Sequence, residues 1–254
     1  MNNSIVRSDI SHVRLAPITE SGNDISNFDY AKNFFDGSHI GVDETGSQDF
    51  FGPLCVVSCF VDERDFDWLL SIGVKDPKEL TNKEVVAIAK EIKDRLIYSL
   101  LILDNSHYNQ LAQEGNNLAN IKAKLYNQAV TNVMQKVQLA VDYKCATQFV
   151  SPKTYFNYLK TEVIVVKDLE FVPKGEEKYL GIMCSAILSR YAYLQYFQNM
   201  SKTLKMKLPR GTSPSVETVA LEVANKYGKK MLFKVTKTNM TNYKRLKNTM
   251  EKAV

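Results

Sequence analysis

Four acidic residues stand where their carboxylates could act together on one reaction. Asp43 and Glu44 end one short apolar run, Asp142 ends another, and Glu176 precedes a long helical pattern. If the two runs are neighbouring strands, their ends bring these acids together at one edge of a sheet. Converging carboxylates repel one another, so such a group usually holds a cation, and hard oxygen ligands select Mg²⁺ or Mn²⁺. Two such ions could clamp the attacking and leaving oxygens of a phosphoryl transfer.

Each acid taken alone could also be a capping or surface residue, but other chemistries have less support. The three histidines lie far apart in the sequence with no recognisable nucleophile beside them, which argues against a Ser-His or Cys-His hydrolase. The four cysteines lack zinc-ligand spacing and are interpreted as reduced, buried thiols. No apolar run approaches the roughly 20 residues that a membrane-spanning helix needs. No secretory signal pattern opens the chain, so we expect a cytoplasmic protein that contacts no membrane.

The charges of the 254-residue chain are unevenly distributed. Residues 201–254 contain 13 Lys and Arg against 3 acidic residues, whereas residues 1–200 contain 20 against 25. A basic end joined to a mildly acidic body suits a protein that binds a polyanion and holds cations with carboxylates. A solvated, lysine-rich helical face would give the same composition.

The hydrophobic patterns alternate between strand and helix. Residues 1–37 show no sustained period and are predicted to be an N-terminal arm, followed by one domain over residues 38–254. The predicted strands are residues 39–42, 54–60, 98–103, 139–142 and 163–166, and the predicted helices include a segment of about 15 residues after the capping box of Thr81 and Glu84 and residues 116–137, 152–158, 177–200 and 213–227. This order predicts an α/β fold with a mixed five-stranded sheet, flanking helices and a helical C-terminal region.

Several short motifs occur in a fixed order between about residues 39 and 245. They are GVDETG at 41–46, GP at 52–53, VKDPKELT at 74–81, YN at 108–109, NN at 116–117, KA at 122–123, KGEEK at 174–178, AILSRY at 186–191 and LPRG at 208–211. Together they resemble the signature of the prokaryotic type 2 ribonucleases H, and within that family the ribonuclease HIII group.

The resemblance implies an RNase H-like fold and cleavage of the RNA strand of RNA/DNA hybrids, leaving a 5′-phosphate and a 3′-hydroxyl. It also implies dependence on Mg²⁺ or Mn²⁺. The metal-binding acids of the family fall on Asp43, Glu44 and Asp142, and its fourth active-site acid falls on Glu176. A Glu at this fourth position favours ribonuclease HIII over ribonuclease HII, where an Asp is usual.

A second set of residues is predicted to bind the hybrid. Backbone amides of the loop at Thr45, Gly46 and Ser47 could read a 2′-hydroxyl, the group that separates RNA from DNA. Basic side chains could contact phosphates without reading sequence. These candidates are Lys75, Lys78, Lys202, Lys205, Lys207 and Arg210. We expect the protein to act as a monomer.

Two alternative functions stay open at this stage. One is a ribonuclease HII-like enzyme that acts at single ribonucleotides in DNA. The other is a hybrid-binding module with decayed catalysis, because Gln48 and Pro77 replace residues usual in the family. Residues 1–37 are also too short for the TATA-binding-protein-like domain that typically precedes ribonuclease HIII.

Overall fold

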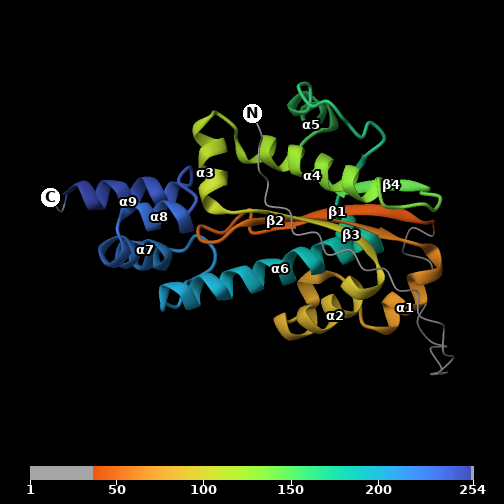
Figure 1. The fold of residues 1–254 in the computed structure, drawn as a ribbon, viewed down its shortest axis with the longest axis horizontal. Coiled ribbons are helices and arrows are strands. Elements are labelled where there is room, and N and C mark those ends of the chain that lie inside the picture. Colours follow the sequence, from red (N-terminus) through yellow and green to blue (C-terminus); the bar gives the residue numbers. More distant parts are fainter. Residues whose placement is uncertain (1–36, 253–254) are drawn as a thin grey trace.

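A mixed five-stranded sheet forms the centre of this computed structural model, which describes residues 37–252 (Figure 1). The strands are His39–Thr45 (β1), Leu54–Val61 (β2), Ile97–Leu103 (β3), Tyr143–Thr147 (β4) and Glu170–Val172 (β5). Their order is β3-β2-β1-β4-β5. The pairs β1–β2 and β2–β3 are antiparallel, whereas β1–β4 and β4–β5 are parallel. The predicted fold class is therefore confirmed.

Helices cover both faces of the sheet. They are Phe66–Ser71 (α1), Asn82–Arg95 (α2), Asn105–Gln113 (α3), Leu118–Met134 (α4), Pro152–Tyr158 (α5), Leu180–Leu204 (α6), Pro214–Tyr227 (α7), Lys229–Val235 (α8) and Thr241–Lys252 (α9). In Figure 1, α4 and α5 lie on one side of the sheet, and α1, α2 and α6 lie on the other. The last three helices gather at one end, as the predicted helical C-terminal region requires.

The apolar core is divided among these layers. All residues of β2 are buried, because helices cover this central strand on both faces. One cluster of buried side chains lies between the sheet and α4 and α5, and a second lies between the sheet and α1, α2 and α6. A third cluster joins the C-terminal half of α6 to α7, α8 and α9. Helix α6 therefore connects the sheet to the C-terminal helices.

Helix α2 begins where its capping signal predicts. The Thr81 hydroxyl accepts a hydrogen bond from the Glu84 amide at 3.3 Å, and the Glu84 carboxylate accepts one from the Thr81 amide at 2.7 Å. This reciprocal pair satisfies two amides that the helix leaves unpaired. The Ser151 hydroxyl caps α5 by accepting a hydrogen bond from the Thr154 amide at 3.2 Å, and Gly228 follows the last residue of α7.

Two glycines allow β1 and α6 to touch backbone to backbone. A Cβ atom at Gly41 would lie 2.2 Å from the Gly181 carbonyl carbon and 2.2 Å from the Ile182 nitrogen. The Ser185 hydroxyl donates to the Gly41 carbonyl at 3.1 Å. This contact fixes α6 under the strand that carries Asp43.

Two predicted strands are wrong. The predicted strand 139–142 ends before β4 begins, and Leu139 is 50% exposed. The predicted strand 163–166 is not β5 either, and Val163 is 100% exposed. Both predictions followed short apolar runs, whereas β4 and β5 lie at one side of the sheet and carry polar residues such as Tyr143 and Glu170. Because β4 begins at Tyr143, Asp142 precedes this strand and does not end it.

The predicted N-terminal arm, residues 1–37, lies outside the described residues apart from Gly37. Within residues 37–252, no helix combines the length and the apolar character needed to cross a bilayer.

Candidate active site

Asp43 and Glu44 lie together at the C-terminal end of β1, beneath α4. The Tyr126 hydroxyl donates to Glu44 Oε2 and lies 3.4 Å from Asp43 Oδ1. Lys122 Nζ, one helical turn earlier on α4, lies 2.5 Å from Glu44 Oε1. The side chains of Lys122 and Glu44 are only 11% and 9% exposed, so this ion pair is largely shielded from water. Helix α4 therefore supplies the groups that hold the acidic pair in place.

Glu176 approaches the same end of the sheet from a tight turn. It lies in the 3₁₀ turn Gly175–Glu177, which follows Lys174 in the left-handed conformation with φ 54°. Its Oε1 accepts a hydrogen bond from Lys78 Nζ at 2.7 Å, and its Oε2 accepts one from the Thr147 hydroxyl at 3.0 Å. Burial raises the pKa of Glu176, but the hydrogen bonds from Lys78 and Thr147 outweigh it, and the pKa lies below its ordinary value.

The pKa of Asp43 is strongly raised in this arrangement. Burial, followed by the negative charge of Glu44, raises the pKa of Asp43 to about 8, and Glu176 adds to the shift. The negative charges of Glu44 and Glu176 therefore act on Asp43, although Glu176 is distant from it in the sequence. A bound cation would reverse this effect, because it favours the ionised carboxylate.

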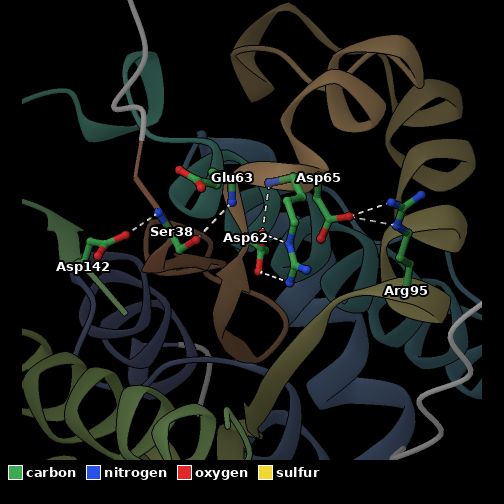
Figure 2. A network of polar contacts seen from close by, with 7 residues as sticks. Ser38, Asp62, Glu63, Asp65, Arg95 and Asp142 are labelled. Carbon is green, nitrogen blue, oxygen red and sulfur yellow. Dashed lines mark hydrogen bonds and ion pairs between the residues drawn. The ribbon is translucent and has the colours of Figure 1, made fainter. Parts of the chain in front are cut away.

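Asp142 does not join these acids. Its amide donates to the Ser38 carbonyl at 2.8 Å, and its Oδ2 accepts from the Ser38 amide at 2.9 Å. Figure 2 shows it beside Ser38, in a network that includes Asp62 and Glu63. It therefore lies before β4, about 16 Å along the strand direction from Asp43 at about 3.3 Å per residue. The prediction that Asp142 is a metal ligand beside Asp43 and Glu44 is wrong.

Thr147 occupies the place that the prediction gave to Asp142. The parallel register pairs Val42 with Ala146, so Thr147 is the residue level with Asp43. Residues at the same level of adjacent strands point to the same face. Within residues 37–252, no group of three or more His, Cys, Asp or Glu side chains is arranged to hold a metal ion. Because Thr147 offers a hydroxyl where a carboxylate was expected, the donors present do not fit the expected two-metal centre.

The loop after β1 is anchored inside the molecule. The Thr45 hydroxyl lies 2.9 Å from the Ser189 hydroxyl of α6. Gly46 has φ 95°, and a Cβ atom there would lie 2.2 Å from the Pro53 carbonyl oxygen and 2.8 Å from the Tyr193 ring. The missing Cβ thus serves packing against Tyr193 and Pro53, a role that the sequence did not reveal.

A buried lysine holds the other end of this loop. Lys237 Nζ donates to the Asp49 carbonyl at 2.8 Å and to the Gly52 carbonyl at 2.6 Å. Burial lowers the pKa of Lys237 to about 8. The Gly211 amide donates to Asp49 Oδ1 at 2.5 Å, which brings the predicted phosphate ligand Arg210 beside the loop. Ser47 is half-buried and Gln48 is exposed.

The predicted basic residues lie at different distances from the acids. Lys78 contacts Glu176 directly, and Lys75 pairs with Glu79 at 3.9 Å. Arg190 of α6 supports the Lys78 segment by donating to the Pro77 carbonyl at 2.8 Å.

Lys202, Lys205 and Lys207 are exposed near the C-terminal end of α6. Since Ser189 is level with Thr45, Lys202 lies roughly 20 Å further along the helix at 1.5 Å per residue. Only a substrate long enough to span this distance can contact these three lysines and the acids at the same time.

Comparisons with known proteins agree with this scaffold. The ribonuclease HII family model matches residues 40–243. The chain belongs to the ribonuclease HII family. Ribonucleases HIII of Bacillus cereus (strain AH187) and Bacillus anthracis (strain A0248) are each 37% identical to it over 207 residues, which cover 81% of this chain and 67% of each relative.

The solved structures place the fold in the same group. Bst-RNase HIII in complex with Mn²⁺ superimposes with a TM-score of 0.82 at 25% identity, covering 92% of this chain and 77% of that chain. Ribonuclease H2 from Pyrococcus horikoshii OT3 has a TM-score of 0.70 at 18% identity, covering 85% and 99%, and shows the fold alone. The resemblance found in the motifs is confirmed: the chain is a ribonuclease H, a hydrolase, and its relatives support the use of a divalent metal.

Three residues at this candidate site were not predicted. Lys122 and Tyr126 were visible as a pair four residues apart on an amphipathic helix, a spacing that places both on one face. Nothing in the sequence showed that this face points at Glu44. Thr147 gave no signal, because a threonine in a strand is ordinary.

Proposed function

We propose that this chain binds RNA/DNA hybrids and hydrolyses internal phosphodiester bonds of the RNA strand. The observation that carries the proposal is the gathering of Asp43, Glu44 and Glu176 at one end of β1, on a scaffold shared with ribonuclease HIII. Hydrolysis adds water to the phosphorus and breaks its bond to the 3′ oxygen. The products are a 5′-phosphate and a 3′-hydroxyl.

The chain's own groups bind and orient the hybrid. Lys78 contacts Glu176, and Arg210 lies beside the loop that follows β1, which suits contacts of both side chains to phosphates near one linkage. The half-buried loop at Thr45, Gly46 and Ser47 supports the approach of backbone amides to a 2′-hydroxyl. Its anchors to α6 and Lys237 keep this surface rigid before substrate binds.

A divalent cation, Mg²⁺ or Mn²⁺, supplies charge stabilisation to the phosphoryl group when it is bound. The carboxylates present for it are those of Asp43, Glu44 and Glu176. Because Thr147 stands at the place predicted for Asp142, these residues do not form the expected two-metal set. The roles that the side chains themselves support in the hydrolysis are binding and positioning of the hybrid.

Cleavage of matched substrates tests the proposal. A labelled RNA/DNA hybrid and a DNA duplex with a single ribonucleotide are incubated with Mg²⁺, Mn²⁺ or chelator. We expect cuts in the continuous hybrid with metal and none with chelator. Preference for the lone ribonucleotide would favour the ribonuclease HII-like alternative, and failure to bind the hybrid in chelator would contradict the proposal.

Asp43→Asn is the informative variant. The substitution removes a charge and little volume, so we expect hybrid affinity to persist while cleavage falls by at least about 100-fold, the upper range for outer-shell partners of a metal. Gel-shift and single-turnover measurements on the same preparation check both parts. Equal turnover by Asp43→Asn and wild type would contradict the role of Asp43.

A second candidate function is hybrid binding with weakened catalysis. Thr147 favours it, because this position offers a hydroxyl where a carboxylate was expected. The two candidates share the substrate and differ in turnover, so the metal lanes of the cleavage assay separate them.

A further inference from the structure

We infer that Thr147 leaves the acidic end of β1 one carboxylate short, so that this chain binds divalent cations weakly and metal occupancy limits its hydrolysis of RNA. The consequence for hydrolysis rests on the proposed function. The central claim concerns the metal affinity of the protein alone, and it can be measured without a nucleic acid.

The position of Thr147 is fixed by three independent contacts. The parallel pairing of Val42 with Ala146 places Thr147 level with Asp43. Thr147 pairs with Val172 of β5 on its other side, so it cannot slip along the sheet. Its hydroxyl donates to Glu176 Oε2 at 3.0 Å. An aspartate here would therefore face both Asp43 and Glu176.

The existing carboxylates are already occupied by protein donors. One oxygen of Glu44 forms an ion pair with Lys122, and the other accepts a hydrogen bond from the Tyr126 hydroxyl. Glu176 receives a donor on each oxygen as well, Lys78 on Oε1 and the Thr147 hydroxyl on Oε2.

Asp43 Oδ1 accepts from the Glu44 amide at 2.8 Å. Among the described residues, Asp43 Oδ2 is thus the one oxygen of these three acids with no hydrogen-bond donor. A cation that takes ligands from Glu44 and Glu176 must therefore compete with protein donors for their oxygens.

The formal charges lead to the same conclusion. Even if all three carboxylates are ionised, the positive charges of Lys122 and Lys78 leave one net negative charge, too little to attract two divalent ions. Divalent-ion affinity follows the number and charge of the ligands and the rigidity of their cavity. Replacing the Thr147 hydroxyl with a carboxylate adds one charge and removes one competing donor to Glu176.

Calorimetric titration with Mn²⁺ tests the inference on the 254-residue chain without nucleic acid. The variants are Thr147→Asp and Thr147→Asn, which match in size and differ in charge. Asp142→Asn is the control at the position that the sequence suggested. Asp142 is exposed, and its carboxylate accepts a hydrogen bond from the Ser38 amide just before the start of β4.

We expect wild type to bind Mn²⁺ with a dissociation constant on the order of 1 mM, the weak end of the range for carboxylate sites. Thr147→Asp should bind about tenfold more tightly or better, because one ligand charge is added. Thr147→Asn and Asp142→Asn should match wild type. Micromolar binding by wild type, or equal affinities of the Asp and Asn variants at position 147, would overturn the inference.

Thermal unfolding supplies a second measurement. Without metal, Thr147→Asp adds a like charge beside Asp43 and should lower Tm, and Mn²⁺ should restore it more than in wild type. If this variant fails to fold in chelator, the wild-type titration decides the inference by itself.

Hybrid binding in chelator separates this inference from the proposed function. Loss of hybrid binding by wild type would end the proposed function and leave the Mn²⁺ affinities to decide the inference. Hybrid binding with tight wild-type Mn²⁺ binding would support the function and overturn the inference.

Discussion

At the scale of single residues, Glu44 depends on Lys122. Both side chains are largely buried, and their charged atoms lie 2.5 Å apart. Removing one member of such a pair leaves an uncompensated buried charge, so we expect Lys122→Met to lower the free energy of unfolding by about 3 kcal/mol. Urea denaturation followed by circular dichroism measures this change.

The double variant is the control for that prediction. Adding Glu44→Gln to Lys122→Met removes the stranded charge, and we expect it to recover most of the lost stability. If the double variant is as unstable as the sum of the two single variants, Lys122 acts through packing and not through its charge.

The sequence predicted some site residues and missed others for a physical reason. Asp43 and Glu44 were predictable because they end a strand whose apolar pattern is clear. Asp142 was misplaced because the apolar run before it is a loop, and the exposed Leu139 shows that this run does not reach the core. Thr147 could be found only from the register between β1 and β4, which depends on contacts distant in sequence.

At the scale of elements, the crossing of β1 and α6 sets the geometry of the site. A Cβ atom at Gly41 would lie 2.2 Å from backbone atoms of α6, which cannot move without the helix. We expect Gly41→Ala to lower the free energy of unfolding by about 3 kcal/mol, the upper end for overpacking. Thermal or urea unfolding checks this value.

Gly115→Ala separates this steric effect from the general effect of losing a glycine. Gly115 has φ 90°, and a Cβ atom there would meet nothing within 4 Å, so its substitution strains only the backbone. We expect a loss of about 1 kcal/mol there. Similar losses at both positions would show that the backbone contact of Gly41 is unimportant.

The same crossing buries a histidine whose protonation should affect stability. His39 Nε2 accepts from the Gly181 amide at 2.9 Å, so Nδ1 carries the hydrogen and donates to the Gly37 carbonyl at 2.7 Å. Burial lowers the pKa of His39 to about 4, although the nearby charge of Asp142 opposes the shift. The folded protein therefore keeps this ring neutral under conditions in which the unfolded chain protonates it.

Because the pKa of His39 is lower in the folded protein than in the unfolded chain, this group makes the protein less stable as the pH falls. Above the unfolded pKa of about 6.5 the ring is neutral in both states and contributes nothing. As the pH falls from about 6.5 to about 4, only the unfolded chain takes up the proton, so this group lowers stability by about 3 kcal/mol. We expect His39→Gln to show a smaller loss of unfolding free energy over this range. An identical pH profile for both proteins would contradict the prediction.

Helix ends were more predictable than edge strands. Thr81 and Glu84 stabilise the start of α2 through bonds within four residues, so the local sequence contains the whole signal. β5 has only three residues and exists through its pairing with β4. Its position depends on the sheet, and the more apolar segment around Val163 gave the stronger but misleading pattern.

At the scale of the whole molecule, we propose that the basic C-terminal region extends the candidate site along α6. Lys202, Lys205 and Lys207 are exposed beyond the loop that follows β1, on the side of the sheet that α6 covers. A duplex that covers the acids and follows α6 would bring its phosphates to these lysines and release counterions there. The charge asymmetry of the sequence would then correspond to one continuous binding track.

Charge reversal tests this track. Changing Lys202, Lys205 and Lys207 together to Glu should weaken hybrid binding and reduce the slope of log affinity against log salt by about one unit for each phosphate that the protein no longer neutralises. Binding in chelator across a salt series measures the slope without cleavage. The exposed lysines around α5, on the opposite side of the sheet, provide a matched triple reversal that should leave the slope unchanged: Lys153, Lys160 and Lys167. Equal slopes for wild type and the α6 variant would exclude the C-terminal region from the substrate surface.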